Sequence, residues 1–151
     1  TIAKYNKKTL DLYKELQSIS NRLGNWDETK YSFISLSKDD EYTLAEVYIY
    51  EKDYPAAIKL AKNHITYHPL VTLVAESIKQ DYPKESIFLY DQLVQEYIGY
   101  KKRESYQEAA SYAKKMKPIY ESILKDLISW QKYLSDIRLR YKQFRALQDE
   151  F

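Results

Sequence analysis

The stretch EKDYP at residues 51–55 returns as KQDYP at residues 79–83, so an Asp-Tyr-Pro signal recurs at an interval of 28 positions. Proline has a fixed φ and no backbone N–H. The first turn of a helix tolerates it, because that N–H would have no intrahelical partner there. Pro55 and Pro83 therefore predict the starts of helices rather than their ends.

Aromatic residues follow the same interval. Trp26, Tyr54 and Tyr82 lie 28 residues apart, each near the predicted start of a helix, and each interval has room for two short helices. Pro69 predicts a further helix start, for a helix over residues 70–81. A pair of short helices cannot bury its apolar face alone and must stack on its neighbours. This spacing predicts an all-α array of antiparallel helical hairpins.

Apolar residues at three- and four-residue steps predict further helices in the first part of the chain. A helix over about residues 3–23 would end at Gly24, a second begins after Asn25 as its N-cap, and a third spans residues 40–52. The inner face of the first helix would hold Leu10, Tyr13, Leu16, either Ile19 or Ser20, and Leu23.

Three longer helices are expected to close the array. They span residues 84–99, residues 104 to about 126 with a kink before Pro118, and residues from about 128 to 150. The last helix would carry one apolar seam of Trp130, Leu134, Ile137, Tyr141 and Phe144. An ordinary amphipathic bundle would show the same seam, and the 28-residue spacing favours the array. We expect one domain over residues 1–151, with short paired helices in 1–82.

Composition excludes several classes of protein. Lys plus Arg total 24 against 22 for Asp plus Glu, so the net charge of +2 carries no global signal for nucleic acid or for a membrane. Cysteine is absent, which excludes disulfides and thiolate chemistry and is compatible with the cytoplasmic location that we expect. No apolar run approaches the roughly 18 residues of a membrane span. The first residue, Thr1, suggests a fragment of a longer protein.

Residues 44–69 resemble the tetratricopeptide repeat. The matching positions are Leu44, Ala45, Tyr48, Asp53, Tyr54, Ala57, Ala61 and Pro69. The small residues matter because the two helices of a hairpin cross closely there. His64 stands where the repeat has a small Ala, and the 28-residue period is shorter than usual, so the resemblance implies a tetratricopeptide-like array rather than a regular superhelix.

A second resemblance covers residues 40–151. The order LAEVYIYEKDYPAAIKLA, YPKES, SYQEAASYAKKMKPIYESI, Trp130 and YKQFRALQDEF is similar to the C-terminal helical region of bacterial SWIM zinc-finger proteins. The zinc ligands of that family, a Cys-x-Cys followed by a Cys-x-His, have no counterpart here. The resemblance therefore implies a helical appendage without the metal and without the nucleic-acid contact of the finger.

The residues offer no catalytic or metal-binding constellation. His64 and His68 are spaced to share a helical face, but two ligands do not make a metal site, and capping or turn roles suit them better. The acids at residues 39–41 are placed to cap a helix. No phosphate-binding glycine loop or nucleophile elbow occurs. We expect no cofactor, no metal and no enzymatic activity.

Tyrosine occurs 17 times, and it suits grooves where helical hairpins meet partners. In tetratricopeptide-like units the first helix of each hairpin lines the concave side. By that resemblance Tyr42, Glu46 and Tyr50 are candidate partner-binding residues. The alternative is that they pack against the neighbouring hairpin.

Residues 130–145 contain five cations and one acid, the strongest local charge in the chain. Arg138, Lys142 and Arg145 would share a face of the last helix, with Tyr141 and Phe144 nearby for base stacking. A solvated face whose long side chains cover the seam is the simpler interpretation. The function that we expect is thus a protein-interaction or scaffolding module, with nucleic-acid binding through this helix as the alternative.

Overall fold

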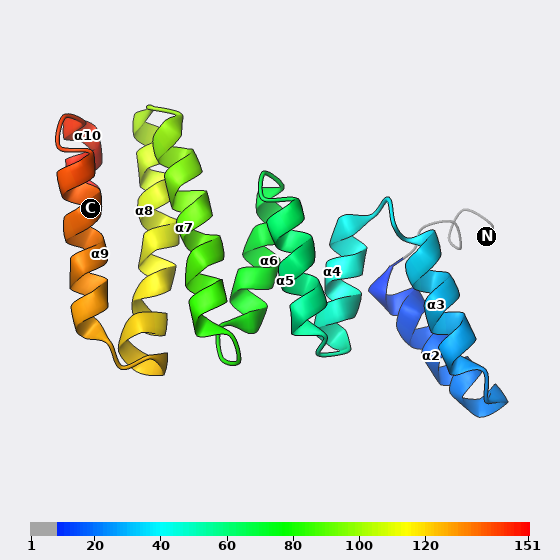
Figure 1. Ribbon diagram of the computed structural model, residues 1–151. Coiled ribbons are helices and arrows are strands. Elements are labelled where there is room, and N and C mark those ends of the chain that lie inside the picture. Colours follow the sequence, from blue (N-terminus) through cyan, green and yellow to red (C-terminus); the bar gives the residue numbers. More distant parts are fainter. Residues whose placement is uncertain (1–8) are drawn as a thin grey trace. The chain divides into compact units, whose positions relative to one another are not determined.

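The computed structural model describes residues 9–151, and the regular elements in this range are all helices joined by short turns (Figure 1). The helices are α2 (Leu10–Leu23), α3 (Trp26–Leu36), α4 (Glu41–Tyr50), α5 (Tyr54–Asn63), α6 (His68–Ile78), α7 (Pro83–Gly99), α8 (Arg103–Pro118), a π-helical turn η1 (Ile119–Ile123), α9 (Leu127–Arg140) and α10 (Arg145–Gln148). The predicted all-α class is confirmed. The expected helix start at residue 3 lies outside the described residues.

The helices form two compact units, divided in the sequence between Asn63 and His64. In the first unit α2 packs on α3 and α4, and α4 packs on α5; in the second, α7 packs on both α6 and α8. One repeat-like domain over residues 1–151 stays a prediction.

The proline signals start helices as predicted. Pro55 is the second residue of α5, Pro69 is the second residue of α6, and Pro83 is the first residue of α7. The aromatic markers coincide with these starts, because Trp26 and Tyr54 are the first residues of α3 and α5 and Tyr82 is the N-cap of α7. At these positions the backbone N–H that proline lacks would have no acceptor within the helix.

Side-chain oxygens cap several helices. Asp40 accepts a hydrogen bond from the Thr43 backbone N–H at 3.0 Å, and Asp126 accepts one from the Ser129 backbone N–H at 3.0 Å. Thr9 caps α2 in the same way. Asn25 occupies the predicted N-cap position of α3 but makes no capping bond with its side chain. Within the acidic run at residues 39–41, Asp40 therefore has the expected capping role, and Glu41 is the first residue of α4.

The core of the first unit centres on Tyr13, Phe33 and Val47, all buried, with Leu10, Leu12, Leu16 and Trp26 packed around them. Tyr13 meets the rings of Trp26 and Phe33 edge-on, with 5.1 Å between centroids in both cases. The two alternatives for the inner face of α2 are separated: Ser20 is buried, whereas Ile19 is exposed.

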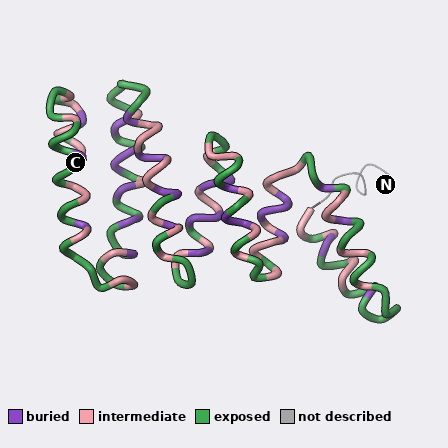
Figure 2. The backbone as a smooth tube through the Cα atoms, in the orientation of Figure 1, coloured by how far each residue is buried: buried purple, intermediate pink, exposed green. Residues whose placement is uncertain are grey.

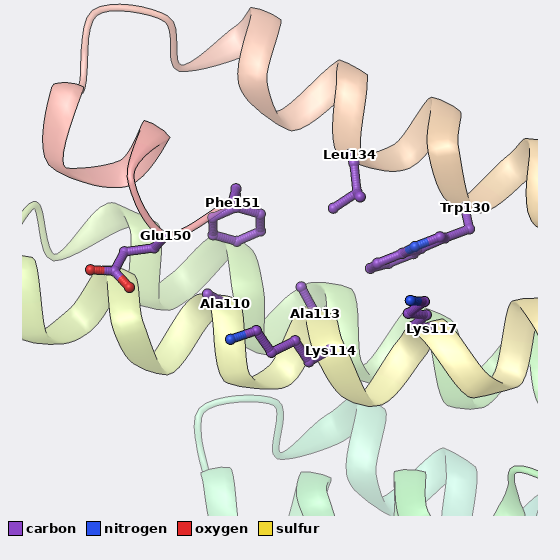
Figure 3. A pocket seen from close by; sticks show the side chains of 8 residues that line it. All are labelled: Ala110, Ala113, Lys114, Lys117, Trp130, Leu134, Glu150 and Phe151. Carbon is purple, nitrogen blue, oxygen red and sulfur yellow. The ribbon is translucent and has the colours of Figure 1, made fainter.

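The buried residues of the second unit lie mainly where α6, α7 and α8 face one another (Figure 2). Ala109, Ala110 and Ala113 are buried on α8. Trp130 and Ile137 of the predicted seam are buried on α9. Trp130 and Leu134 point from α9 towards α8 (Figure 3).

The sequence predicted a kink before Pro118, whereas α8 continues through Pro118 and a π turn follows it. Pro118 ends α8, and the chain continues through η1, where the Leu124 N–H donates to the Ile119 carbonyl at 2.9 Å. A proline inside a helix removes one i to i−4 hydrogen bond and crowds the preceding turn. A π turn is one of the known ways for a helix to absorb such a disturbance.

The expectation of one helix from about residue 128 to 150 is wrong. Helix α9 ends at Arg140, residues 141–144 form a turn, and α10 is a separate short helix. The Gln148 side chain donates to the Arg138 and Tyr141 carbonyls, which stabilises the break. The turn lets Phe144 stack on Tyr106 of α8, with 6.1 Å between ring centroids, and Leu147 becomes fully buried. Apolar burial outweighs helix continuation here.

Left-handed backbone conformations occur at Gly24 and at three lysines. Gly24 ends α2 with φ 74°, and its N–H donates to the Ser20 carbonyl. Lys52, Lys101 and Lys125 have φ values of 59°, 54° and 54° at the turns after α4, α7 and η1. A chain with two glycines thus uses lysine where others use glycine, at a conformational cost of about 1 kcal/mol each.

We predict that Gly24→Ala lowers the free energy of unfolding by about 1 kcal/mol, because a Cβ strains the left-handed conformation while meeting no atom within 4 Å. Gly99→Ala is the matched control: its added Cβ also meets nothing within 4 Å, and Gly99 is the last residue of α7 and has no left-handed backbone. There alanine should be neutral or stabilising. Urea denaturation followed by circular dichroism measures both, and equal effects would contradict the capping role.

Candidate functional site

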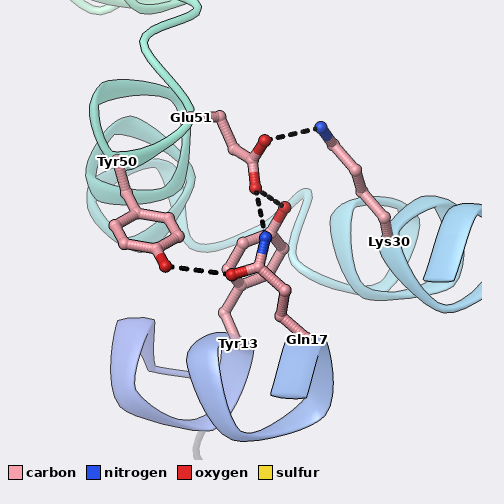
Figure 4. A network of polar contacts seen from close by, with 5 residues as sticks. All are labelled: Tyr13, Gln17, Lys30, Tyr50 and Glu51. Atoms are coloured by element: carbon pink, nitrogen blue, oxygen red, sulfur yellow. Dashed lines mark hydrogen bonds and ion pairs between the residues drawn. The ribbon is translucent and has the colours of Figure 1, made fainter. Parts of the chain in front are cut away.

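A polar network joins α2, α3 and the end of α4 in the first unit (Figure 4). The Tyr13 hydroxyl donates to Glu51 Oε1 at 2.8 Å, and Gln17 Nε2 donates to the same oxygen at 3.3 Å. Lys30 Nζ lies 3.0 Å from Glu51 Oε2. The Tyr50 hydroxyl donates to Gln17 Oε1 at 2.9 Å. Glu51 therefore gathers donors from two other helices.

Opposing effects act on the pKa of the Glu51 carboxyl. Burial raises this pKa. The hydrogen bonds from Tyr13 and Lys30 and the charge of Lys30 together lower it by more, so the net pKa lies below the usual value of 4.5. Glu51 thus contributes to folding as a carboxylate. Burial, and then the Glu51 carboxylate, raise the pKa of Tyr13, so this hydroxyl acts as a hydrogen-bond donor and not as a base.

The candidate residues Tyr42, Glu46 and Tyr50 lie one turn apart along α4, and we call them the α4 stripe. Tyr42 and Glu46 are partly buried, and Tyr50 is 43% exposed. Tyr50 also packs within its own unit: its ring centroid lies 6.2 Å from that of Tyr13, and Lys14 Nζ lies 5.0 Å above it. One side of Tyr50 thus packs on α2 while the rest stays exposed, and its role in partner binding stays a prediction.

Glu46 is the one charged residue of the α4 stripe, and its charge is disfavoured by its surroundings. Burial raises the pKa of its carboxyl, and the charges of Asp40 and Asp11 raise it further, whereas Lys14 lowers it in part. Within residues 9–151 the Glu46 carboxylate makes no hydrogen bond or ion pair. Among the described residues, the charges that act on the Glu46 carboxylate are thus two carboxylates and one ammonium group.

The basic residues at the C-terminal end do not share one helical face. Arg138 lies on α9, Lys142 in the following turn and Arg145 on α10, all of them exposed. Arg138 Nη2 donates to the Phe151 carbonyl. The nearby rings of Tyr141 and Phe144 stack on each other, with 5.9 Å between centroids, and Phe144 also stacks on Tyr106. The break after Arg140 removes the expected shared face.

The two histidines are separated by a helix boundary. His64 lies in the turn after α5, and His68 begins α6. His68 Nδ1 lies 3.1 Å from the Tyr97 hydroxyl, and Nε2 lies 3.0 Å from a Glu96 oxygen without making a hydrogen bond to it. No group of three or more potential metal ligands occurs in the described part of the chain. Nor does any helix there have the length and apolarity that crossing a membrane requires.

A pocket of about 180 Å³ lies in the second unit between α8, α9 and the last two residues (Figure 3). Its lining consists of Ala110, Ala113, Lys114, Lys117, Trp130, Leu134, Glu150 and Phe151. The four α8 residues follow i, i+3, i+4, i+7 spacing, so they form one helical face. The sequence shows one stripe in the spacing of those residues and another in that of Trp130 and Leu134, but not that the two face each other across a pocket.

Comparison with known proteins finds one partial likeness. No protein-family model matches the chain, and no solved structure matches it significantly. A stretch of 78 residues, 52% of the chain, is 35% identical to the uncharacterized protein YwqB of Bacillus subtilis (strain 168). That stretch covers 14% of YwqB, so the chain spans a small part of the length of this relative. The tetratricopeptide-like and SWIM resemblances stay predictions.

We predict that Glu51→Gln lowers the free energy of unfolding by about 1 kcal/mol at pH 7, because it weakens charge-assisted hydrogen bonds from Tyr13 and Lys30. The folded pKa is depressed, so the contribution is complete above 4.5 and disappears as the pH falls through the lower folded pKa. The difference between parent and variant should therefore shrink below pH 4.5. Glu15→Gln, at an exposed site on α2, is the control. A difference that does not depend on pH would contradict this role.

Nucleic-acid binding by the basic residues has its own test. This alternative predicts that labelled single-stranded DNA binds with an affinity that falls steeply with salt, and that Arg138→Glu with Arg145→Glu abolishes the binding. The control exchanges two exposed cations elsewhere in the second unit, Lys84→Glu with Lys115→Glu. A flat fluorescence-anisotropy titration at low salt would remove the alternative.

Proposed function

We propose that this chain is a non-enzymatic protein-interaction module whose α4 stripe, Tyr42, Glu46 and Tyr50, receives a basic segment of a partner protein. Helical hairpins present rigid faces without needing a conformational change, which suits recognition by shape. The environment of Glu46 is the observation that carries the proposal.

Glu46 is kept in a partly buried position beside Asp40 and Asp11, where its charge is disfavoured. Such an arrangement lowers the stability of the free chain at neutral pH, and uncompensated features of this kind concentrate at functional sites. A lysine or arginine of a partner would supply the missing charge and form an ion pair that is partly shielded from water. Partly exposed Tyr50 beside it offers a ring for the aliphatic part of that side chain.

The stripe also has a defined rigidity. Tyr50 is fixed by its hydrogen bond to Gln17 and by ring contact with Tyr13, and Asp40 caps the helix that carries all three residues. Side chains that are already ordered lose less entropy on binding. A partner therefore meets a prearranged surface.

The proposal is tested with an array of short peptides, each with one fixed residue, and the tightest peptide is then measured in solution. We expect selection of Lys or Arg, and an affinity about tenfold weaker for Glu46→Gln at pH 7. The same substitution should raise the thermal stability of the free chain slightly, because the raised pKa marks a charge that folding disfavours. Binding should weaken as the pH falls through the Glu46 pKa, which lies above 4.5.

Glu15→Gln is the matched control, since it removes the same charge from an exposed site of the first unit. It should leave binding unchanged. Tyr50→Ala is a poor test, because it also removes contacts to Gln17 and Tyr13. An array without preference for cationic residues, or equal affinities for parent and Glu46→Gln, would refute the proposal.

The context of the module is part of the proposal. The SWIM resemblance and the short share of YwqB that the chain covers support a module within a longer protein. A cytoplasmic setting is part of the proposal, and the absence of cysteine is compatible with it. A Cys-x-Cys and Cys-x-His pattern elsewhere in the full gene product would establish the SWIM relationship, and its absence would end it.

A further inference from the structure

The pocket in the second unit is built by residues that leave space. Ala110 and Ala113 form its floor on α8, and Trp130 and Phe151 stand at different places along it (Figure 3). Trp130 is held by its ring contacts with Tyr120 and Tyr133, at 6.0 and 5.9 Å between centroids. The apolar part of the lining is therefore shaped by fixed aromatic side chains above small ones.

The C-terminal residues are tied to both neighbouring helices. Arg103 of α8 lies 3.3 Å from Asp149, and Gln107 of α8 donates to Glu150 at 3.4 Å. Arg138 of α9 donates to the Phe151 carbonyl. These contacts hold Phe151 at the pocket, so its ring belongs to the lining of a formed site.

The size of the pocket limits what it can hold. Sites for drug-sized ligands measure roughly 300–1,000 Å³, whereas a dry cavity of about 150 Å³ accepts benzene. At about 180 Å³ this pocket fits one ring or one large aliphatic side chain. Pockets of this size in protein interfaces receive single anchor residues.

The charges around the pocket indicate which kind of partner residue would lie next to that anchor residue. Lys114 and Lys117 lie one turn apart on the exposed edge of α8, and Glu150 lies at the other end, beside Phe151 (Figure 3). Lys117 has Glu121 at 3.8 Å as an exposed ion pair, which contributes little. Within residues 9–151 Lys114 makes no ion pair or hydrogen bond. The edge next to Trp130 is thus cationic.

We infer that this pocket is a second binding site, which takes the phenylalanine side chain of a peptide segment whose next residues are acidic. The ring enters between Trp130 and Phe151 over the alanine floor, and the acidic residues meet Lys114 and Lys117. The site differs from the α4 stripe in its unit and in its sign of charge. Its failure would leave the proposed function of the α4 stripe intact, because the variants that test the two sites share no residue.

The test uses Trp130 as the reporter. The chain has two tryptophans, and Trp26→Phe leaves Trp130 as the sole one. The probe is a seven-residue peptide with blocked ends, with a central Phe followed by Asp and Glu. We expect a saturable change of Trp130 fluorescence with this peptide, which weakens as salt is added. A peptide with Ala in place of Phe should give no change.

Two variants separate the apolar and the charged parts of the site. Ala113→Leu places a larger side chain on the pocket floor and should weaken binding at least tenfold. Lys114→Gln with Lys117→Gln should weaken it about tenfold, as expected for two exposed ion pairs. The control with the same net charge, Lys115→Gln with Lys132→Gln, changes exposed lysines outside the pocket and should bind like the parent. Circular dichroism melting checks that each variant is folded.

Four results would overturn the inference. They are no fluorescence change up to the solubility limit of the peptide, equal binding by the Ala113→Leu chain, equal binding of a peptide with Asn and Gln in place of the acids, and equal loss in the control. Binding of 3-phenylpropionate as tight as that of the peptide would assign the pocket to a small carboxylate instead.

Discussion

Hydrogen bonds from tyrosine hydroxyls to carboxylates hold neighbouring helices together in both units. They join Tyr13 to Glu51 at 2.8 Å, Tyr90 to Glu76 at 2.7 Å and Tyr133 to Asp91 at 2.8 Å. Each bond links two different helices or their ends, and each lets a large ring be buried while its hydroxyl finds a charged acceptor. Because such a bond is directional, it fixes how the helices are rotated against each other, which apolar contact alone does less well. Tyr13, Tyr90 and Tyr133 therefore stabilise the fold of the units that contain them.

The sequence contained strong signals for where helices begin. Proline has one permitted φ, and aspartate and threonine cap by local geometry, so Pro83 or Asp40 acts in the same way whatever surrounds it. The end of the chain shows the opposite case. Residues 128–150 have a continuous helical pattern, and the break at 141–144 follows from the packing of Phe144 and Leu147 against α8. That energy depends on a distant helix, and local periodicity does not contain it.

The candidate sites also differ in whether local sequence or distant packing determines them. The α4 stripe could be chosen in advance, because Tyr42, Glu46 and Tyr50 are spaced along one helix. The raised pKa of Glu46 could not be predicted in this way, since it depends on Asp11 and Lys14 from α2. The pocket needed two stripes to meet across a gap that alanines leave open, and only the fold brings them together. The prediction for the basic residues failed for a different reason. Their charge was counted correctly from the sequence, but the single helix expected to carry them ends at Arg140.

The lysines with left-handed backbones have a practical consequence. Lys52, Lys101 and Lys125 are exposed, and each stands at a turn between consecutive helices. Exposed turns are preferred sites of proteolytic nicking, and trypsin cleaves after lysine. Limited digestion at these three positions would separate α2–α4, α5–α7, α8 with η1, and α9 with α10 as four fragments. The turns with left-handed lysines are thus also suitable positions for dividing the chain into fragments by limited proteolysis.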